Sequence, residues 1–140
     1  MHEMTAANLR SAFGGESMAH MRYKVWATKA ERDGFPNVGR LFKAISFAEQ
    51  VHGTNHFNAM RAVPGGFLVA SMAGFGSGPT AQNLQGAIEG EDFEIAEMYP
   101  MYKAAAEAQA EKAAEQATRN AGPEAGLDTL VREALRAARG

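Results

Sequence analysis

The chain has 140 residues, 46% of them hydrophobic, and its 14 basic and 16 acidic residues give a net charge of −2. This length predicts one domain with a substantial core, and the near-neutral charge, without a basic patch, argues against a nucleic-acid partner. Cysteine is absent, which excludes disulfides, thiolate metal sites and thiol nucleophiles on this chain.

The first two predicted helices form an antiparallel pair. Residues 6–33 place apolar side chains at three- and four-residue steps, after a possible N-cap at Thr5. The Gly-Phe-Pro-Asn segment at 34–37 then combines a helix stop with a helix start. A second helix is predicted over residues 37–62. Because the link between them is short, the two helices must lie antiparallel.

The remaining elements complete an all-α four-helix bundle. The glycine-rich segment 64–79 is too long for a turn, so it predicts a crossover that leaves the second and third helices parallel. The third helix is predicted over residues 80–119, with Thr80 as its cap and a kink at Pro100. A short amphipathic helix over residues 123–138 follows, which makes the fourth helix atypical.

Five side chains on these helices could bind metal. Glu49 and His52 are three residues apart, so they project about 60° from each other on one helix face. Glu91 and Glu94 repeat this spacing on the third helix, and Glu16 lies midway along the first. Carboxylates with an imidazole and no thiolate suit iron or manganese better than a structural zinc.

The predicted layer of acids requires a neutralising partner. Four carboxylates buried together would repel one another and bind protons. Two divalent cations balance four carboxylate charges, and bridging carboxylates would hold the ions close together. Any one glutamate, taken alone, more often decorates a solvated helix face, but the repeated spacing on two helices favours the metal site.

Three sets of short motifs, one on each long predicted helix, carry a family resemblance. They are Asn8-Leu9, Ala12-Phe13, Gly15-Glu16-Ser17, Ala19 and Arg22-Tyr23, then Ala48-Glu49-Gln50-Val51-His52, then Thr80, Asn83-Leu84, Gly90-Glu91, Glu94 and Met98-Tyr99-Pro100. Over about residues 5–103 this ordered set resembles the rubrerythrins, in the ferritin-like superfamily. The resemblance implies a ferritin-like four-helix bundle, with residues 1–140 as a single diiron domain of the short form that has no rubredoxin domain.

The resemblance also implies a cofactor and its ligands. The cofactor is a pair of iron ions, for which manganese or zinc could substitute. The implied metal ligands are Glu16, Glu49, His52, Glu91 and Glu94. Of these, Glu16, Glu49 and His52 would serve one iron and Glu91 would help hold the second.

A second group of residues is implied to act in catalysis: His52, Glu94, Tyr23 and Tyr99. His52 and Glu94 belong to a redox-dependent ligand exchange, and the two tyrosines match residues that hydrogen-bond the ligands. Ordinary packing in an amphipathic core is usually the better explanation for a tyrosine. His20 and His56 stand one turn beyond Glu16 and His52, where a supporting or exposed position is favoured over ligation.

The C-terminal part departs from the family pattern. The ferritin-like plan needs a Glu-x-x-His pair on the fourth helix, yet no histidine follows His56, and Ala125 and Asp128 stand where the pair belongs. Residues 103–126 have only alanine as apolar side chains apart from Pro123, which would break a helix. A reading-frame slip in the gene, a mis-assigned trace or true divergence would each produce this change. The second metal site is then short of ligands.

Two classes of function follow. One is a non-haem diiron oxidoreductase that reduces hydrogen peroxide with electrons from a separate donor, such as a rubredoxin-like protein; an O2-reactive ferroxidase is a variant of it. The other is a ferritin-like metal-binding or dimerising bundle whose incomplete site is non-catalytic. We expect a homodimer, which segment 64–79 could make domain-swapped. Without an apolar leader or a long apolar run, we expect a cytoplasmic protein with no membrane partner.

Overall fold

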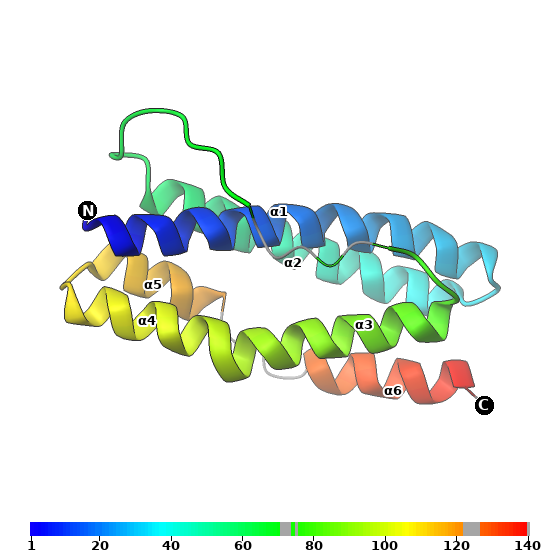
Figure 1. The fold of residues 1–140 in the computed structure, drawn as a ribbon. Helices are drawn as coiled ribbons and strands as arrows, with labels where there is room; N and C mark the ends of the chain where they lie inside the picture. The colour runs from blue at the N-terminus through cyan, green and yellow to red at the C-terminus, as the bar shows by residue number, and fades with distance from the viewer. Residues whose placement is uncertain (71–73, 75, 122–126, 140) are drawn as a thin grey trace.

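The computed structural model describes residues 1–70, 74, 76–121 and 127–139, without the side chains of residues 127 and 128. Its helices are α1 (Glu3–Arg32), α2 (Pro36–Ala59), α3 (Thr80–Phe93), the π-helix η1 (Glu94–Met98), α4 (Tyr99–Ala108), α5 (Lys112–Asn120) and α6 (Leu127–Arg139). Figure 1 shows four rows of helix: α1, α2, the continuous α3–η1–α4, and α5 followed by α6. The predicted all-α four-helix bundle with an atypical fourth helix is confirmed. None of the described helices combines the length and apolar character needed to cross a membrane.

The turn between α1 and α2 follows from its residue types. Gly34 has a φ of +88°, a conformation that glycine adopts without strain. The backbone N–H groups of Gly34 and Phe35 donate to the carbonyls of Glu31 (3.2 Å) and Ala30 (2.9 Å), which ends α1 in a Schellman motif. Pro36 then occupies the first position of α2, where its missing N–H costs nothing. The antiparallel pair predicted from this segment is observed.

The main core lies toward the end of the bundle that holds this turn. Tyr23, Trp26 and Phe42 are buried there, with ring centroids 5.6–5.8 Å apart. Leu84 and Ile88 from α3 join this cluster, as do Val131 and Leu135 from α6. The amphipathic α6 thus supplies the large apolar side chains that the alanine-rich segment before it lacks.

The long connection between α2 and α3 is a crossover, as predicted. It carries the chain from the end of α2 back along α1, where the indole nitrogen of Trp26 donates to the Gly76 carbonyl at 2.9 Å (Figure 1). The Thr80 hydroxyl then donates to Asp33 Oδ2 at 2.7 Å, so α3 begins beside the α1–α2 turn. α2 and α3 therefore run in the same direction.

The third helix ends earlier than the sequence predicted, and the single helix over residues 80–119 is wrong. Ala110 has a φ of +55°. Its N–H donates to the Glu107 carbonyl (3.0 Å) and that of Glu111 to the Ala106 carbonyl (2.9 Å), which is the same Schellman pattern as at the end of α1. The chain reverses here although no glycine or proline marks the position. An alanine in this conformation costs about 1 kcal/mol, which tertiary packing must offset.

The fourth row of the bundle is divided between α5 and α6, which both run antiparallel to α3–η1–α4 (Figure 1). α5 packs against α2 and α4, whereas α6 packs mainly against α3. Two buried alanines of α5, Ala114 and Ala117, contact Leu9 and Ala106 in a second, smaller core. Residues 122–126, including the fourth-helix position of Ala125, and the side chain of Asp128 lie outside the described residues.

Candidate metal centre

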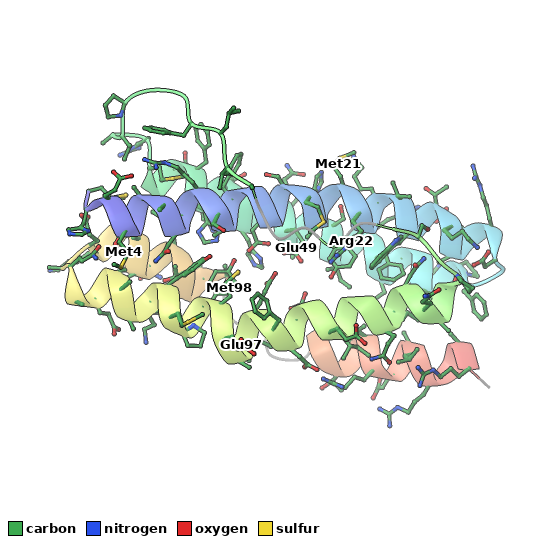
Figure 2. All side chains as sticks on the ribbon, in the orientation of Figure 1. Met4, Met21, Arg22, Glu49, Glu97 and Met98 are labelled. Atoms are coloured by element: carbon green, nitrogen blue, oxygen red, sulfur yellow. The ribbon has the colours of Figure 1, made fainter. Side chains whose placement is uncertain are left out.

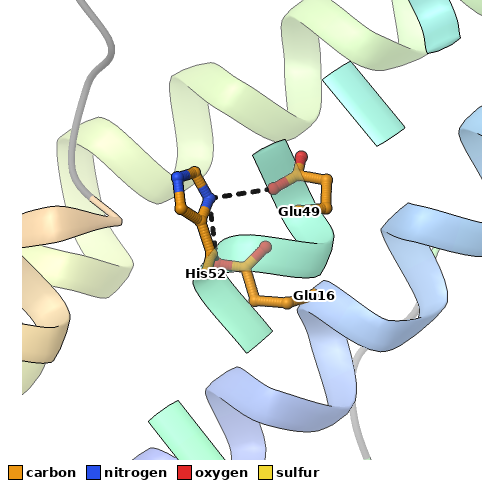
Figure 3. Close-up of side chains that lie close together, drawn as sticks. All are labelled: Glu16, Glu49 and His52. Carbon is orange, nitrogen blue, oxygen red and sulfur yellow. Dashed lines mark hydrogen bonds and ion pairs between the residues drawn. The ribbon is translucent and has the colours of Figure 1, made fainter. Parts of the chain in front are cut away.

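A cluster of three buried side chains lies between α1 and α2. Glu16, Glu49 and His52 are 1%, 3% and 7% exposed, and one ligand atom from each lies within 4.8 Å of the others. His52 Nδ1 is 3.1 Å from Glu49 Oε2 and 3.8 Å from Glu16 Oε1 (Figure 3). The three-residue spacing on α2 puts Glu49 and His52 on one face, and the antiparallel pairing brings Glu16 opposite them.

Two further side chains complete the surroundings of Glu16. The hydroxyl of Tyr99, at the start of α4, donates a hydrogen bond to Glu16 Oε1. His56 is fully buried, and its Nε2 lies 3.1 Å from the Tyr99 hydroxyl and 3.7 Å from Glu16 Oε1. Because the tyrosine proton goes to Glu16, His56 Nε2 donates to the tyrosine oxygen. The sequence placed His56 one turn beyond His52 but did not indicate this contact.

The third helix carries the other two candidate acids. Glu91 and Glu94 are half-buried, on α3 and at the start of η1. Glu94 lines a cavity together with Glu16. The hydroxyl of Tyr23 accepts a hydrogen bond from Arg22 Nη2 at 3.4 Å, and burial, followed by the charge of Glu91, raises the pKa of Tyr23. The structure therefore brings Glu16, Glu49, His52 and Tyr99 into direct contact and places the third-helix acids around them.

Burial and mutual repulsion govern the charges of Glu16 and Glu49. Burial raises the pKa of Glu49 to about 11, with repulsion from Glu16 and Glu94 adding to it. Burial opposes the charge on Glu16 as well, but its neighbours His56, Glu49 and Tyr99 outweigh it and lower the pKa of Glu16. At neutral pH and without metal, Glu16 therefore carries the charge and Glu49 holds a proton.

The pKa of Glu94 is also raised by its surroundings. Burial raises its pKa to about 9, the charges of Glu16 and Glu91 add to the effect, and the guanidinium of Arg22 opposes it. Half-burial leaves this carboxyl more screened by solvent than Glu49 is. The region therefore holds more carboxylates than it can ionise at once unless a cation is supplied.

The residues present fit a bound divalent cation. Glu16 Oε2 and His56 Nδ1 are buried side-chain atoms with no hydrogen-bond partner among the described residues. A buried carboxylate oxygen without a partner costs about 1–3 kcal/mol, and a metal ion would satisfy it. The donor set of carboxylate oxygens and imidazole nitrogen suits iron or manganese.

A helical bundle with a carboxylate–imidazole cluster midway along its helices defines a ferritin-like metal-binding protein. The sequence profile of the rubrerythrin family matches residues 7–123. The chain therefore belongs to the rubrerythrin family.

Individual relatives agree with this assignment. Rubrerythrin-2 of Clostridium acetobutylicum is 53% identical over 106 residues, which cover 76% of this chain and 58% of that protein. The rubrerythrin of Porphyromonas gingivalis is 33% identical over 107 residues, covering 75% and 52%. The chain thus spans little more than half the length of these relatives. Fully reduced, all-ferrous nigerythrin has the same fold, with a TM-score of 0.80, 24% identity and coverage of 96% of this chain and 66% of that one.

Proposed function

We propose that this chain is the diiron domain of a rubrerythrin-type oxidoreductase that reduces hydrogen peroxide. The observation that supports it is the buried contact of Glu16, Glu49 and His52, in which Glu16 Oε2 has no hydrogen-bond partner among the described residues. The reaction takes up two electrons and two protons and converts one peroxide into two waters. Because the chain has no cysteine, a rubredoxin-like electron donor would be a separate protein or segment.

The chain's own residues have distinct tasks in this proposal. Glu16, Glu49 and His52 would hold one iron, and Glu91 and Glu94 would hold the second, with Glu94 and His52 taking part in ligand exchange. When bound, the iron pair supplies the electrons that break the O–O bond. The surrounding protein keeps the ligands oriented.

The Tyr99–His56 pair would act through Glu16. The Tyr99 hydroxyl fixes the orientation of the Glu16 carboxylate, and His56 holds the tyrosine oxygen in turn. This chain of hydrogen bonds also keeps a proton on the Tyr99 hydroxyl beside the carboxylate, while burial and the nearby acids raise the pKa of Tyr99. Tyr23 would support the other side of the site from its buried position between α1 and α2.

Anaerobic loading with Fe²⁺, followed by metal analysis and stopped-flow mixing with hydrogen peroxide, tests the proposal. We expect two irons per chain and oxidation by peroxide in the unmodified protein. Glu49→Gln should lose iron and peroxide reactivity. Glu107→Gln, which changes an exposed carboxylate of α4 that pairs with Lys103, should lose neither. One bound iron or none, with no oxidation by peroxide, would contradict the proposal.

One observation favours the second candidate function, a metal-binding bundle with an incomplete, non-catalytic site. The side chains that α5 buries in the bundle are Ala114, Ala117 and Thr118, so the described part of the fourth row buries no carboxylate. Iron that binds tightly but is not oxidised by peroxide would support this alternative. Mixing the ferrous protein with O2 in place of peroxide distinguishes a ferroxidase from both.

We also propose that the chain forms a homodimer. Large apolar side chains are exposed on the outer faces of α1 and α2: Met21, Val25, Phe47, Val51 and Phe57. A second copy would bury them, either with helix pairs exchanged through the crossover or without exchange. Light scattering that gives the mass of a single chain across a range of concentrations would contradict a dimer of either kind.

A further inference from the structure

A cavity of about 350 Å³ lies between α1 and the α3–η1–α4 helix. Its lining includes Phe93 and Met101, which are exposed at the surface, and Glu16, which is fully buried in the candidate metal centre. The cavity therefore connects solvent with the carboxylates. Figure 2 labels Arg22 and Met98, which line the cavity, whereas Met21 and Glu97 point to opposite outer sides.

Small residues keep this space open. Gly15 on α1 and Gly90 on α3 both line the cavity. A Cβ added at Gly15 would have no atom within 4 Å, and one at Gly90 would meet only Arg22 Nη2, at 3.7 Å. Each glycine inside a helix costs about 1 kcal/mol relative to alanine. Neither backbone conformation nor close packing requires glycine at these two positions, so their shared effect is the open space.

Glu16 links the cavity to the candidate metal centre. Glu16 is 1% exposed, lines the cavity, and has an Oε2 atom without a hydrogen-bond partner among the described residues. The other polar groups on the walls include the carboxylates of Glu89 and Glu94 and the guanidinium of Arg22. A wall with more acidic than basic groups favours cations and neutral solutes over anions.

We propose that this cavity is the access route through which small uncharged hydroperoxides reach the metal centre, and that Gly15 and Gly90 limit the size of what passes. Metal ions entering the empty protein would take the same route. The statement about hydroperoxides rests on the proposed function, whereas the statement about metal ions does not. The two can therefore be tested separately.

The test uses side chains that fill the cavity and leave every candidate ligand in the sequence. Gly15→Met and Gly90→Met each place a flexible side chain in the open space. Ala104→Met is the matched control, because Ala104 is exposed on α4 and lines a different cavity, which reaches Tyr99 from the α5 side. Gly15→Ala adds only the Cβ, so it should fold, gain stability and keep the uptake rate of the unmodified protein.

Two rates are measured by stopped-flow absorbance: Co²⁺ uptake by the metal-free protein, and oxidation of the ferrous protein by hydrogen peroxide or by tert-butyl hydroperoxide. Gly15→Met and Gly90→Met should slow both on the order of tenfold, which corresponds to about 1.4 kcal/mol in the barrier. The loss should be larger for the bulkier hydroperoxide. The amount of metal bound at equilibrium should stay the same, because no ligand has changed.

Unchanged Co²⁺ uptake in both filled variants would overturn the proposal, as would an equal slowing in Ala104→Met. Circular dichroism shows whether each variant folds. If one of the two filled variants does not fold, the Co²⁺ uptake rate of the other tests the proposal. Failure of the unmodified ferrous protein to react with peroxide would overturn the proposed function. In that case Co²⁺ uptake still tests the route.

Discussion

The protonated state of Glu49 makes the stability of the metal-free protein depend on pH. Its pKa is raised from 4.5 to about 11 in the folded chain, so the folded state holds a proton that the unfolded state releases above pH 4.5. The resulting stabilisation is complete below pH 4.5 and is lost as pH rises toward 11. For a group as deeply buried as Glu49, the loss is about 1.4 kcal/mol per pH unit, or roughly 2–3 kcal/mol between pH 6 and 8.

Glu49→Gln isolates this effect, because glutamine has a similar shape and does not titrate. We expect the free energy of unfolding of the metal-free protein, measured by urea denaturation in the presence of a chelator, to fall between pH 6 and 8. The fall should be smaller in Glu49→Gln by roughly 2–3 kcal/mol. Glu107→Gln provides the control for an exposed carboxylate. Parallel pH profiles for Glu49→Gln and the unmodified protein would refute the reasoning, since Glu49 would then be ionised in the folded state.

Three further predictions concern single contacts and turns. Ala110→Gly relieves the strained end of α4 and should raise the free energy of unfolding by about 1 kcal/mol. Ala105→Gly, inside α4, should lower it by about 1 kcal/mol. Thermal unfolding that ranks the two variants the other way would contradict the Schellman assignment. Tyr99→Phe leaves buried polar groups short of a partner and should cost about 1–3 kcal/mol in the metal-free protein, measured by urea denaturation; no cost would argue against the contact with Glu16. Asn83→Ala removes hydrogen bonds to the Gly78 N–H (2.8 Å) and carbonyl (3.0 Å) and should cost about 1–3 kcal/mol; an unchanged urea midpoint would show that this anchor of the crossover is not needed.

Explicit stop and start signals explain which parts of the fold could be predicted from the sequence. Gly34 and Pro36 define the α1–α2 turn by their own backbone preferences, and the length of segment 64–79 requires a crossover. The end of α4 could not be predicted, because an alanine takes the left-handed position at Ala110 and its local preference is helical. Tertiary packing decides the conformation there. The sequence indicated an atypical fourth helix and a helix break at Pro123, but it assigned the residues of α5 to the third helix.

The contacts of the candidate site could likewise be predicted only in part from the sequence. Helical spacing was enough to bring Glu49 and His52 onto one face, and the antiparallel pair brought Glu16 to them. The Tyr99–His56 contact depends on which residues of the third helix face α2. Periodicity cannot supply this where the helix changes from α to π, because the register beyond η1 no longer follows the 3.6-residue repeat.

The π-helix η1 makes the length of the chain between Glu94 and Tyr99 part of the site. The Tyr99 N–H donates to the Glu94 carbonyl five residues earlier, whereas in an uninterrupted α-helix residues five apart point about 140° away from each other. Regular α geometry over the same residues would turn α4 by about 100° relative to α3, whereas deleting one residue from 95–97 would leave Tyr99 and Glu94 on nearly the same helix face. A regular α-helix of unchanged length would therefore keep every candidate ligand and still carry the Tyr99 hydroxyl away from Glu16. The contact between Tyr99 and Glu16 therefore depends on one extra residue in this turn, which an inventory of the ligand residues does not reveal.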